Sequence, residues 1–106
     1  MGYVYLIYDE SNNVYKIGVT RNNDSNRIKK LQTGNATELR VVVMYKCEYP
    51  FRLETMLHKK FNNVRVKNEW FNLTDTDVIN FKDTCDQLNQ TILLLRNNPH
   101  FAKNLK

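Results

Sequence analysis

Hydrophobic and polar positions near the amino terminus follow the pattern of a β-hairpin. The runs Tyr3–Tyr8 and Val14–Thr20 are rich in β-branched and aromatic residues, and Asp9–Asn13 between them is polar. Two such runs around a short loop of Asn, Asp and Ser predict a hairpin. Apolar side chains occur on both faces of each run, so we expect other elements to cover the hairpin on both sides.

The pattern then predicts a helix and a third strand. Polar residues at positions 22–25 are suitable helix N-caps, and a short helix follows over Arg27–Gln32. Gly34 is well placed to end this helix in a left-handed conformation. Leu39–Tyr45 carries the strongest strand signal of the chain, because β-branched and aromatic residues dominate it.

A second helix is predicted after Pro50. Leu53, Leu57 and Phe61 recur at intervals of four and form the buried stripe of a helix over Phe51–Phe61. Residues 62–68 are predicted to be a basic loop, and residues 69–71 a short strand or a packed loop.

The carboxyl-terminal third predicts one long helix. Thr74 and Asp77 have the spacing of a capping box, and Asn98-Pro99 ends the helix. Its apolar stripe consists of Val78, Phe81, Cys85, Leu88, Ile92 and Leu95. This stripe has two interpretations: it packs on the body of the same domain, or it forms the seam of a homodimer.

These elements predict an α+β fold with a small three-stranded antiparallel sheet, in ββαβα order, flanked by helices and followed by a long C-terminal helix. The 106 residues suit one domain. Residues 1–73 form its core, and residues 74–106 form the helix and tail packed on the same domain.

Charge points to a nucleic acid partner. The net charge is +5, and the stretch from Lys16 to Lys67 holds twelve Lys and Arg against four acidic residues. A basic patch of this kind attracts polyanions, of which DNA is the expected one. No apolar run approaches the roughly 18 residues of a membrane span, and no signal peptide is visible. We therefore expect an intracellular protein, in the cytoplasm or nucleus of a host cell, with Cys47 and Cys85 as reduced thiols.

The hairpin carries a family resemblance. Tyr3-Val4-Tyr5, followed after ten residues by Lys16-Ile17-Gly18, resembles the paired motif of the GIY-YIG nuclease superfamily. The segments RIKKLQTGN, RLETMLHKKF and NEWFNL resemble later parts of the family pattern, in the same order, and the last is similar to the short phage- and virus-borne branch. The resemblance runs from Tyr3 to Leu73 and leaves the C-terminal helix outside.

The resemblance implies a metal-dependent endonuclease that hydrolyses DNA phosphodiester bonds. It places one divalent metal ion, Mg²⁺ or Mn²⁺, on Glu54, and it makes Tyr5 the group that activates the attacking water and Arg27 the group that stabilises the developing charge. The residue types suit this chemistry independently, since the arginine fork binds phosphate oxygens and Mg²⁺ is commonly held by a carboxylate together with substrate oxygens. The alternative is a catalytically inactive nucleic-acid-binding module with the same fold.

Lys16 stands where the family's second motif has a tyrosine. A hairpin loop of two or four residues would put Lys16 on the face of Tyr5, whereas a loop of three or five would bring Tyr15 there instead. The spacing to Gly18 favours Lys16. Our hypothesis is that Lys16 lowers the pKa of Tyr5 or contacts a phosphate oxygen.

The remaining candidates support these groups. His58 lies one helical turn after Glu54, as a proton donor or supporting group, or simply as an exposed histidine. Trp70 and Phe71 stack on bases or close the core beneath the second helix. The residues expected to attract phosphates are Lys29, Lys30, Lys59, Lys60, Arg65 and Lys67.

Overall fold

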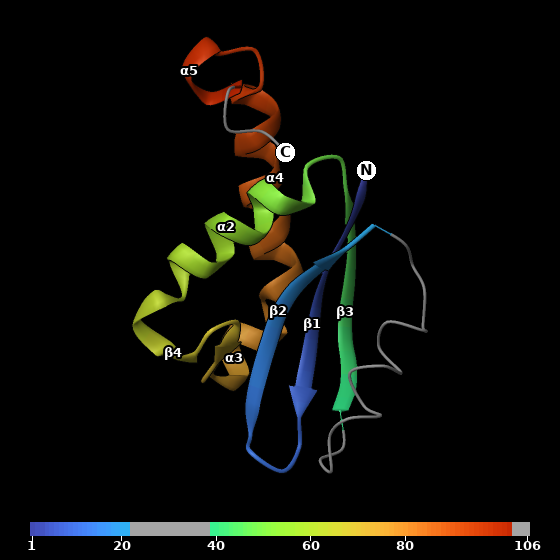
Figure 1. Ribbon diagram of the computed structural model, residues 1–106, viewed down its shortest axis with the longest axis vertical. Coiled ribbons are helices and arrows are strands. Elements are labelled where there is room, and N and C mark those ends of the chain that lie inside the picture. Colours follow the sequence, from blue (N-terminus) through green and yellow to red (C-terminus); the bar gives the residue numbers. More distant parts are fainter. Residues whose placement is uncertain (22–38, 103–106) are drawn as a thin grey trace.

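The computed structural model describes residues 1–21 and 39–102. The predicted helix over Arg27–Gln32, with Arg27, Lys29 and Lys30, lies outside the described residues. The elements, shown in Figure 1, are β1 (Gly2–Asp9), β2 (Val14–Thr20), β3 (Leu39–Cys47), α2 (Pro50–Lys60), the 3₁₀ turn η1 (Asn62–Val64), β4 (Arg65–Lys67), β5 (Trp70–Phe71), α3 (Asp75–Ile79), α4 (Phe81–Leu95) and α5 (Pro99–Ala102).

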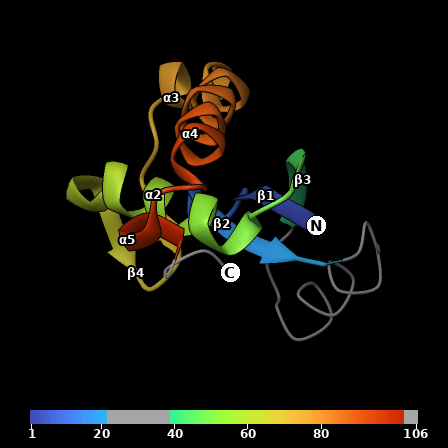
Figure 2. The same ribbon diagram turned by 90° about the horizontal axis from the view of Figure 1, so that it is seen from above.

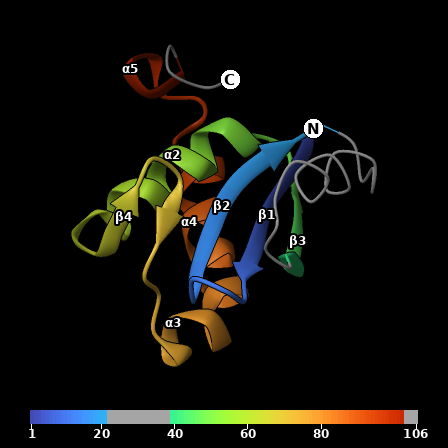
Figure 3. The same cartoon turned by 60° about the horizontal axis from the view of Figure 1, so that its bottom comes forward.

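The sheet is antiparallel and has five strands in the order β3-β1-β2-β5-β4. The α+β class is thus confirmed, but the expectation of three strands was wrong. The predicted basic loop contains β4, which forms a tight hairpin with β5 along the outer edge of β2 (Figure 3). Asn68 makes the turn with a positive φ of 51°, a conformation that Asn tolerates, and the Ile17 amide donates to the Glu69 carbonyl at 3.1 Å.

The loop between β1 and β2 sets the register of the hairpin. The Asp9 carboxylate accepts hydrogen bonds from the Ser11 amide at 3.0 Å and the Asn12 amide at 3.3 Å. Asn13 completes the turn with a φ of 53°. Four residues connect the strands, so Tyr5 lies opposite Gly18.

One face of the sheet is covered by α2 and α4. Figure 2 shows α4 on one side of the strands, where it contacts β3 and α2. The apolar stripe of α2 is buried, as predicted. The main core joins Val4, Leu6, Ile17, Leu53, Leu57, Phe61, Phe71, Phe81, Cys85 and Ile92.

The opposite face has its own buried cluster. Tyr5, Ile7 and Leu39 are buried there, and Trp70 packs against them. Phe71 belongs to the main core, which agrees with the interpretation that it closes the core beneath the second helix. Trp70, in contrast, lies on the other side of the sheet. Neighbouring residues of a strand point to opposite faces, which separates the two aromatic rings.

The predicted long C-terminal helix forms two helices, α3 and α4, instead of one. The capping box at Thr74 and Asp77 is confirmed, with hydrogen bonds of 3.0 and 3.1 Å. Asn80, with φ −93° and ψ 5°, breaks the helical path between α3 and α4. Most of the predicted stripe lies in or against the protein's own core, and only Leu95, 39% exposed, remains open. The stripe therefore does not form the seam of a dimer.

The two cysteines are buried and free. Burial raises the pKa of the Cys47 thiol to about 11 and that of the Cys85 thiol to about 12, so both remain protonated at neutral pH. Among residues 1–21 and 39–102, no helix is long and apolar enough to cross a membrane.

Candidate active site

Tyr5 and Gly18 are packed against each other across the central strands. The two residues are direct partners in the β1–β2 register. A Cβ atom added to Gly18 would collide with the hydroxyl and the tip of the Tyr5 ring. Gly18 therefore leaves the space in which the tyrosine lies, and the Tyr5 hydroxyl is directed over β2. Tyr5 is only 2% exposed, so its position is well defined by packing.

Lys16 lies on the same face as Tyr5, as the four-residue loop requires. Its cross-strand partners are Ile7 on β1 and Trp70 on β5. The Lys16 Nζ atom is 3.6 Å from Glu69 Oε2 and 6.0 Å from the centre of the Trp70 ring. The ammonium group therefore lies towards β5, and both parts of the Lys16 hypothesis stay predictions to test.

Tyr15, the alternative to Lys16, lies on the opposite face. It pairs with Tyr8, and the two ring centres are 4.8 Å apart. Burial raises the pKa of Tyr15, and the neighbouring Tyr8 and Asp75 raise it further. Of the two alternatives, the four-residue loop therefore puts Lys16, and not Tyr15, on the face of Tyr5.

Glu54 is placed beside β2 by the course of α2. At the start of the helix, Pro50 and the Thr20 carbonyl both lie against Gly2. Eight residues later, His58 reaches Ile17. Glu54 is midway between these two points, half-buried, alongside the last residues of β2. The two candidate residues therefore lie on different elements, Tyr5 on β1 and Glu54 on α2, and both of these elements pack against β2.

His58 joins α2 to β2. Its Nε2 donates a hydrogen bond to the Ile17 carbonyl at 2.9 Å, and its ring lies 5.1 Å from that of Phe71. The contacts show a structural link that keeps the Glu54 helix against the strand.

Removing this link should destabilise the fold. We expect His58→Ala to lower the free energy of unfolding by about 1–3 kcal/mol, because the partly buried Ile17 carbonyl loses its partner. Lys59→Ala, an exposed neighbour on the same helix, should change it by less than about 0.5 kcal/mol. Urea denaturation measures both, and equal effects would contradict the structural role.

The predicted phosphate contacts differ in their availability. Lys59, Lys60 and Lys67 are exposed. Arg65 is committed to the protein: its Nη1 donates to the Asn68 carbonyl at 2.7 Å, its Nη2 donates to the His58 carbonyl at 3.4 Å, and its guanidinium lies 5.0 Å from the centre of the Phe71 ring. Arg65 therefore stabilises the β4–β5 hairpin against α2.

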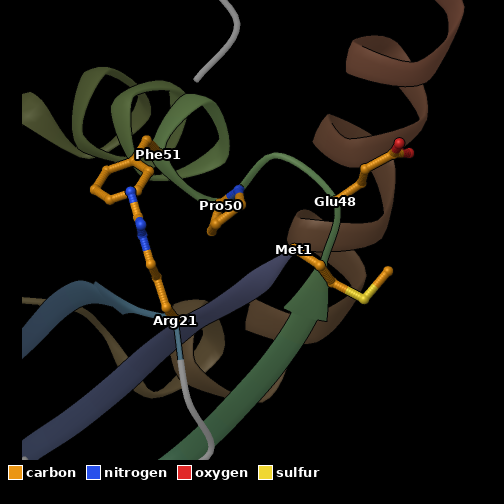
Figure 4. A pocket seen from close by; sticks show the side chains of 5 residues that line it. All are labelled: Met1, Arg21, Glu48, Pro50 and Phe51. Atoms are coloured by element: carbon orange, nitrogen blue, oxygen red, sulfur yellow. The ribbon is translucent and has the colours of Figure 1, made fainter.

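Sequence reasoning missed Arg21 as a cation close to this region. Arg21 follows the end of β2 and extends towards Phe51 on α2. These two residues line a pocket of about 210 Å³ together with Met1, Glu48 and Pro50 (Figure 4). Phe51 and Glu54 are three residues apart and hence neighbours on the helix surface. A single arginine after a predicted strand gives no sequence signal that it will lie beside the helix that carries Glu54.

Comparison with known proteins identifies one family. The T5orf172 domain matches residues 2–88, from β1 into α4. No curated protein matches the chain, and no solved structure does. The match covers most of the 106 residues and includes every described candidate residue. It is consistent with a nuclease-like or DNA-binding domain. The chain therefore belongs to the T5orf172 domain family.

Proposed function

We propose that the chain is a metal-dependent endonuclease that cleaves DNA at a GIY-YIG-like site. The observation that carries this proposal is the packing of Tyr5 on Gly18, because the first motif of the pattern supplies the tyrosine and the second supplies the glycine that makes room for it. Membership of the T5orf172 family supports a nuclease-type or DNA-binding role.

Glu54 suits a hard divalent cation. Mg²⁺ is commonly held by one or two carboxylates, with substrate phosphate oxygens and water completing its coordination. Within residues 1–21 and 39–102 no cluster of three or more His, Cys, Asp or Glu side chains forms a complete protein cage. The fit is thus one half-buried carboxylate plus substrate oxygens. When bound, the metal would neutralise charge on the phosphate and polarise it towards attack.

The protein residues would then perform one displacement at phosphorus. The Tyr5 oxygen, as phenolate, accepts a proton from the attacking water while the new O–P bond forms. The opposite P–O bond breaks, and the leaving oxygen takes a proton from solvent. Arg27 would contact the phosphate oxygens as negative charge develops on them, because its planar fork binds two oxygens at once.

One observation favours the alternative of an inactive nucleic-acid-binding module. Lys16, which stands in place of the second-motif tyrosine, is engaged with Glu69 and lies towards Trp70. Such a contact is what a strand-stabilising residue would make. The two proposals differ in their prediction for cleavage and agree on binding.

The test is nicking of supercoiled plasmid DNA by the purified chain with Mg²⁺, with Mn²⁺ and with EDTA. The endonuclease proposal predicts nicking with metal and none with EDTA. A gel-shift series at increasing salt run alongside should show binding that weakens steeply, because phosphate contacts release counterions. Binding without nicking under any metal condition would favour the inactive module and contradict the endonuclease.

A further inference from the structure

A second hollow lies on the face of the sheet that carries Tyr5, at its hairpin end. It has a volume of about 460 Å³ and is lined by Asp9, Asn12, Val14, Val66, Lys67 and Trp70. Asp9 and Val14 are cross-strand partners at the end of β1 and β2. The β4–β5 hairpin forms the other wall, since it contributes Val66, Lys67 and Trp70.

The walls of this hollow are apolar and aromatic. Trp70 is half-buried, with part of its indole supported by the Tyr5–Ile7 cluster and part lining the hollow. Val66 is 60% exposed and lines the hollow together with Trp70. A flat ligand could therefore lie against the indole with Val66 at its side.

The charges around the hollow favour an anionic flat ligand. Lys67 is exposed at its rim. The Lys16 ammonium lies 6.0 Å from the Trp70 ring centre, but its charge is partly balanced by Glu69 at 3.6 Å, so Lys67 is the main positive charge of the hollow. The one carboxylate of the lining, Asp9, is 4% exposed and is occupied by hydrogen bonds from Ser11 and Asn12. An aromatic face beside lysines is the combination that holds single-stranded nucleic acid by base stacking and phosphate attraction.

We propose that this hollow holds one unstacked base of a single-stranded stretch of nucleic acid. The proposal rests on the proposed function for its choice of ligand. Asp9 lies four residues along β1 from Tyr5, a separation of about 13 Å at roughly 3.3 Å per residue. A base in the hollow and a phosphate at Tyr5 would thus belong to different nucleotides of one strand, and the preferred substrate contains unpaired bases next to the cleaved bond.

Trp70 gives a direct readout, because it is the only tryptophan of the chain. The full chain is titrated in EDTA and low salt with an oligodeoxythymidylate single strand and with a blunt duplex of equal length. Stacking predicts saturable quenching of the tryptophan emission by the single strand and little by the duplex. No quenching by the single strand, or equal quenching by both, would overturn the proposal.

A pair of charge-matched variants tests the location. Val66→Asp puts a carboxylate in the hollow, and Val42→Asp puts the same charge on β3, at the far edge of the sheet, where Val42 is 41% exposed. Anisotropy of a labelled single strand should show about tenfold weaker binding for Val66→Asp and a much smaller change for Val42→Asp. Both valines are exposed, so folding is preserved in each variant. Equal losses would overturn the proposed location.

The base-binding proposal and the endonuclease proposal are tested by different measurements, so each can fail without the other. Quenching is measured without metal and without cleavage, whereas nicking is measured with metal on plasmid DNA. Nicking without quenching would overturn the base-binding hollow and leave the endonuclease standing. Quenching without nicking would support the hollow and contradict the endonuclease.

Discussion

Gly18→Ala is expected to lower the free energy of unfolding by about 1–3 kcal/mol and to remove DNA cleavage. The added methyl group would occupy the space of the Tyr5 hydroxyl and ring tip. These atoms belong to a ring that is 2% exposed and clustered with Ile7 and Leu39, so the ring cannot move aside without disturbing these two residues. Urea denaturation gives the stability change, and plasmid nicking gives the activity.

The sign of the effect should reverse when the tyrosine is removed. In a Tyr5→Ala background the clash is absent, and Gly18→Ala then benefits from the lower conformational freedom of alanine in the unfolded chain. We expect it to stabilise the fold there by about 0.5–1 kcal/mol. A double-mutant cycle measures this coupling. A cycle with the same effect of Gly18→Ala in both backgrounds would show that Tyr5 is not the neighbour that requires glycine.

Glu54→Gln is expected to reduce metal-dependent nicking by at least about 100-fold, the range seen when one group that stabilises transition-state charge is removed. Glutamine keeps the size of the side chain and removes the charge that a divalent cation needs. DNA binding in EDTA should be unchanged or slightly stronger, because a negative charge near the phosphates is removed.

The matched control for this substitution is Glu10→Gln. Glu10 lies in the β1–β2 loop and makes an exposed ion pair with Arg40 at 3.4 Å, a contact worth little in water. The Glu10→Gln variant loses the same charge at a position far from α2. Its nicking rate should stay within about twofold of the rate of the unmodified chain, a difference too small to indicate a lost transition-state contact. A Glu54→Gln variant that nicks as fast as Glu10→Gln would remove Glu54 from the metal site.

The first hairpin was predictable because its signals are local. Polar residues with turn-forming side chains separate two apolar runs, and the parity rule reduced the choice of partner for Tyr5 to Lys16 or Tyr15. Only the length of the loop decides between them, and the Asp9 hydrogen bonds determine that length. The capping box at Thr74 was predictable for the same reason, since its two residues lie within one helical turn.

Of the β4–β5 hairpin, only β5 was predicted, as a short strand or a packed loop over residues 69–71, and β4 was not predictable from pattern. β4 has three residues, all exposed, and two of them are basic, so no alternation marks it as a strand. It forms because Asn68 accepts a positive φ and because the outer edge of β2 pairs with β5. Such pairing joins residues more than 50 positions apart, and no single-sequence signal reports it.

Charge was an incomplete guide to the site. Arg65 looked like a phosphate contact, yet it donates to two backbone carbonyls and stacks on Phe71. Lys16 looked like a partner for Tyr5, yet its ion pair is with Glu69. Glu69 comes from a segment distant from Lys16, whereas the partners of Arg65 lie within seven residues of it, and the residue type alone predicts neither set of contacts.

The initial rate of plasmid nicking by the unmodified chain and by Tyr5→Phe, compared in Mg²⁺, tests most directly whether this face of the sheet is a nuclease site. Phenylalanine keeps the ring on Gly18 and removes only the hydroxyl, so the urea midpoint should change little. We expect nicking by the unmodified chain and a rate at least about 100-fold lower for the variant. Equal nicking by both proteins, or none by either, would contradict a catalytic role for Tyr5.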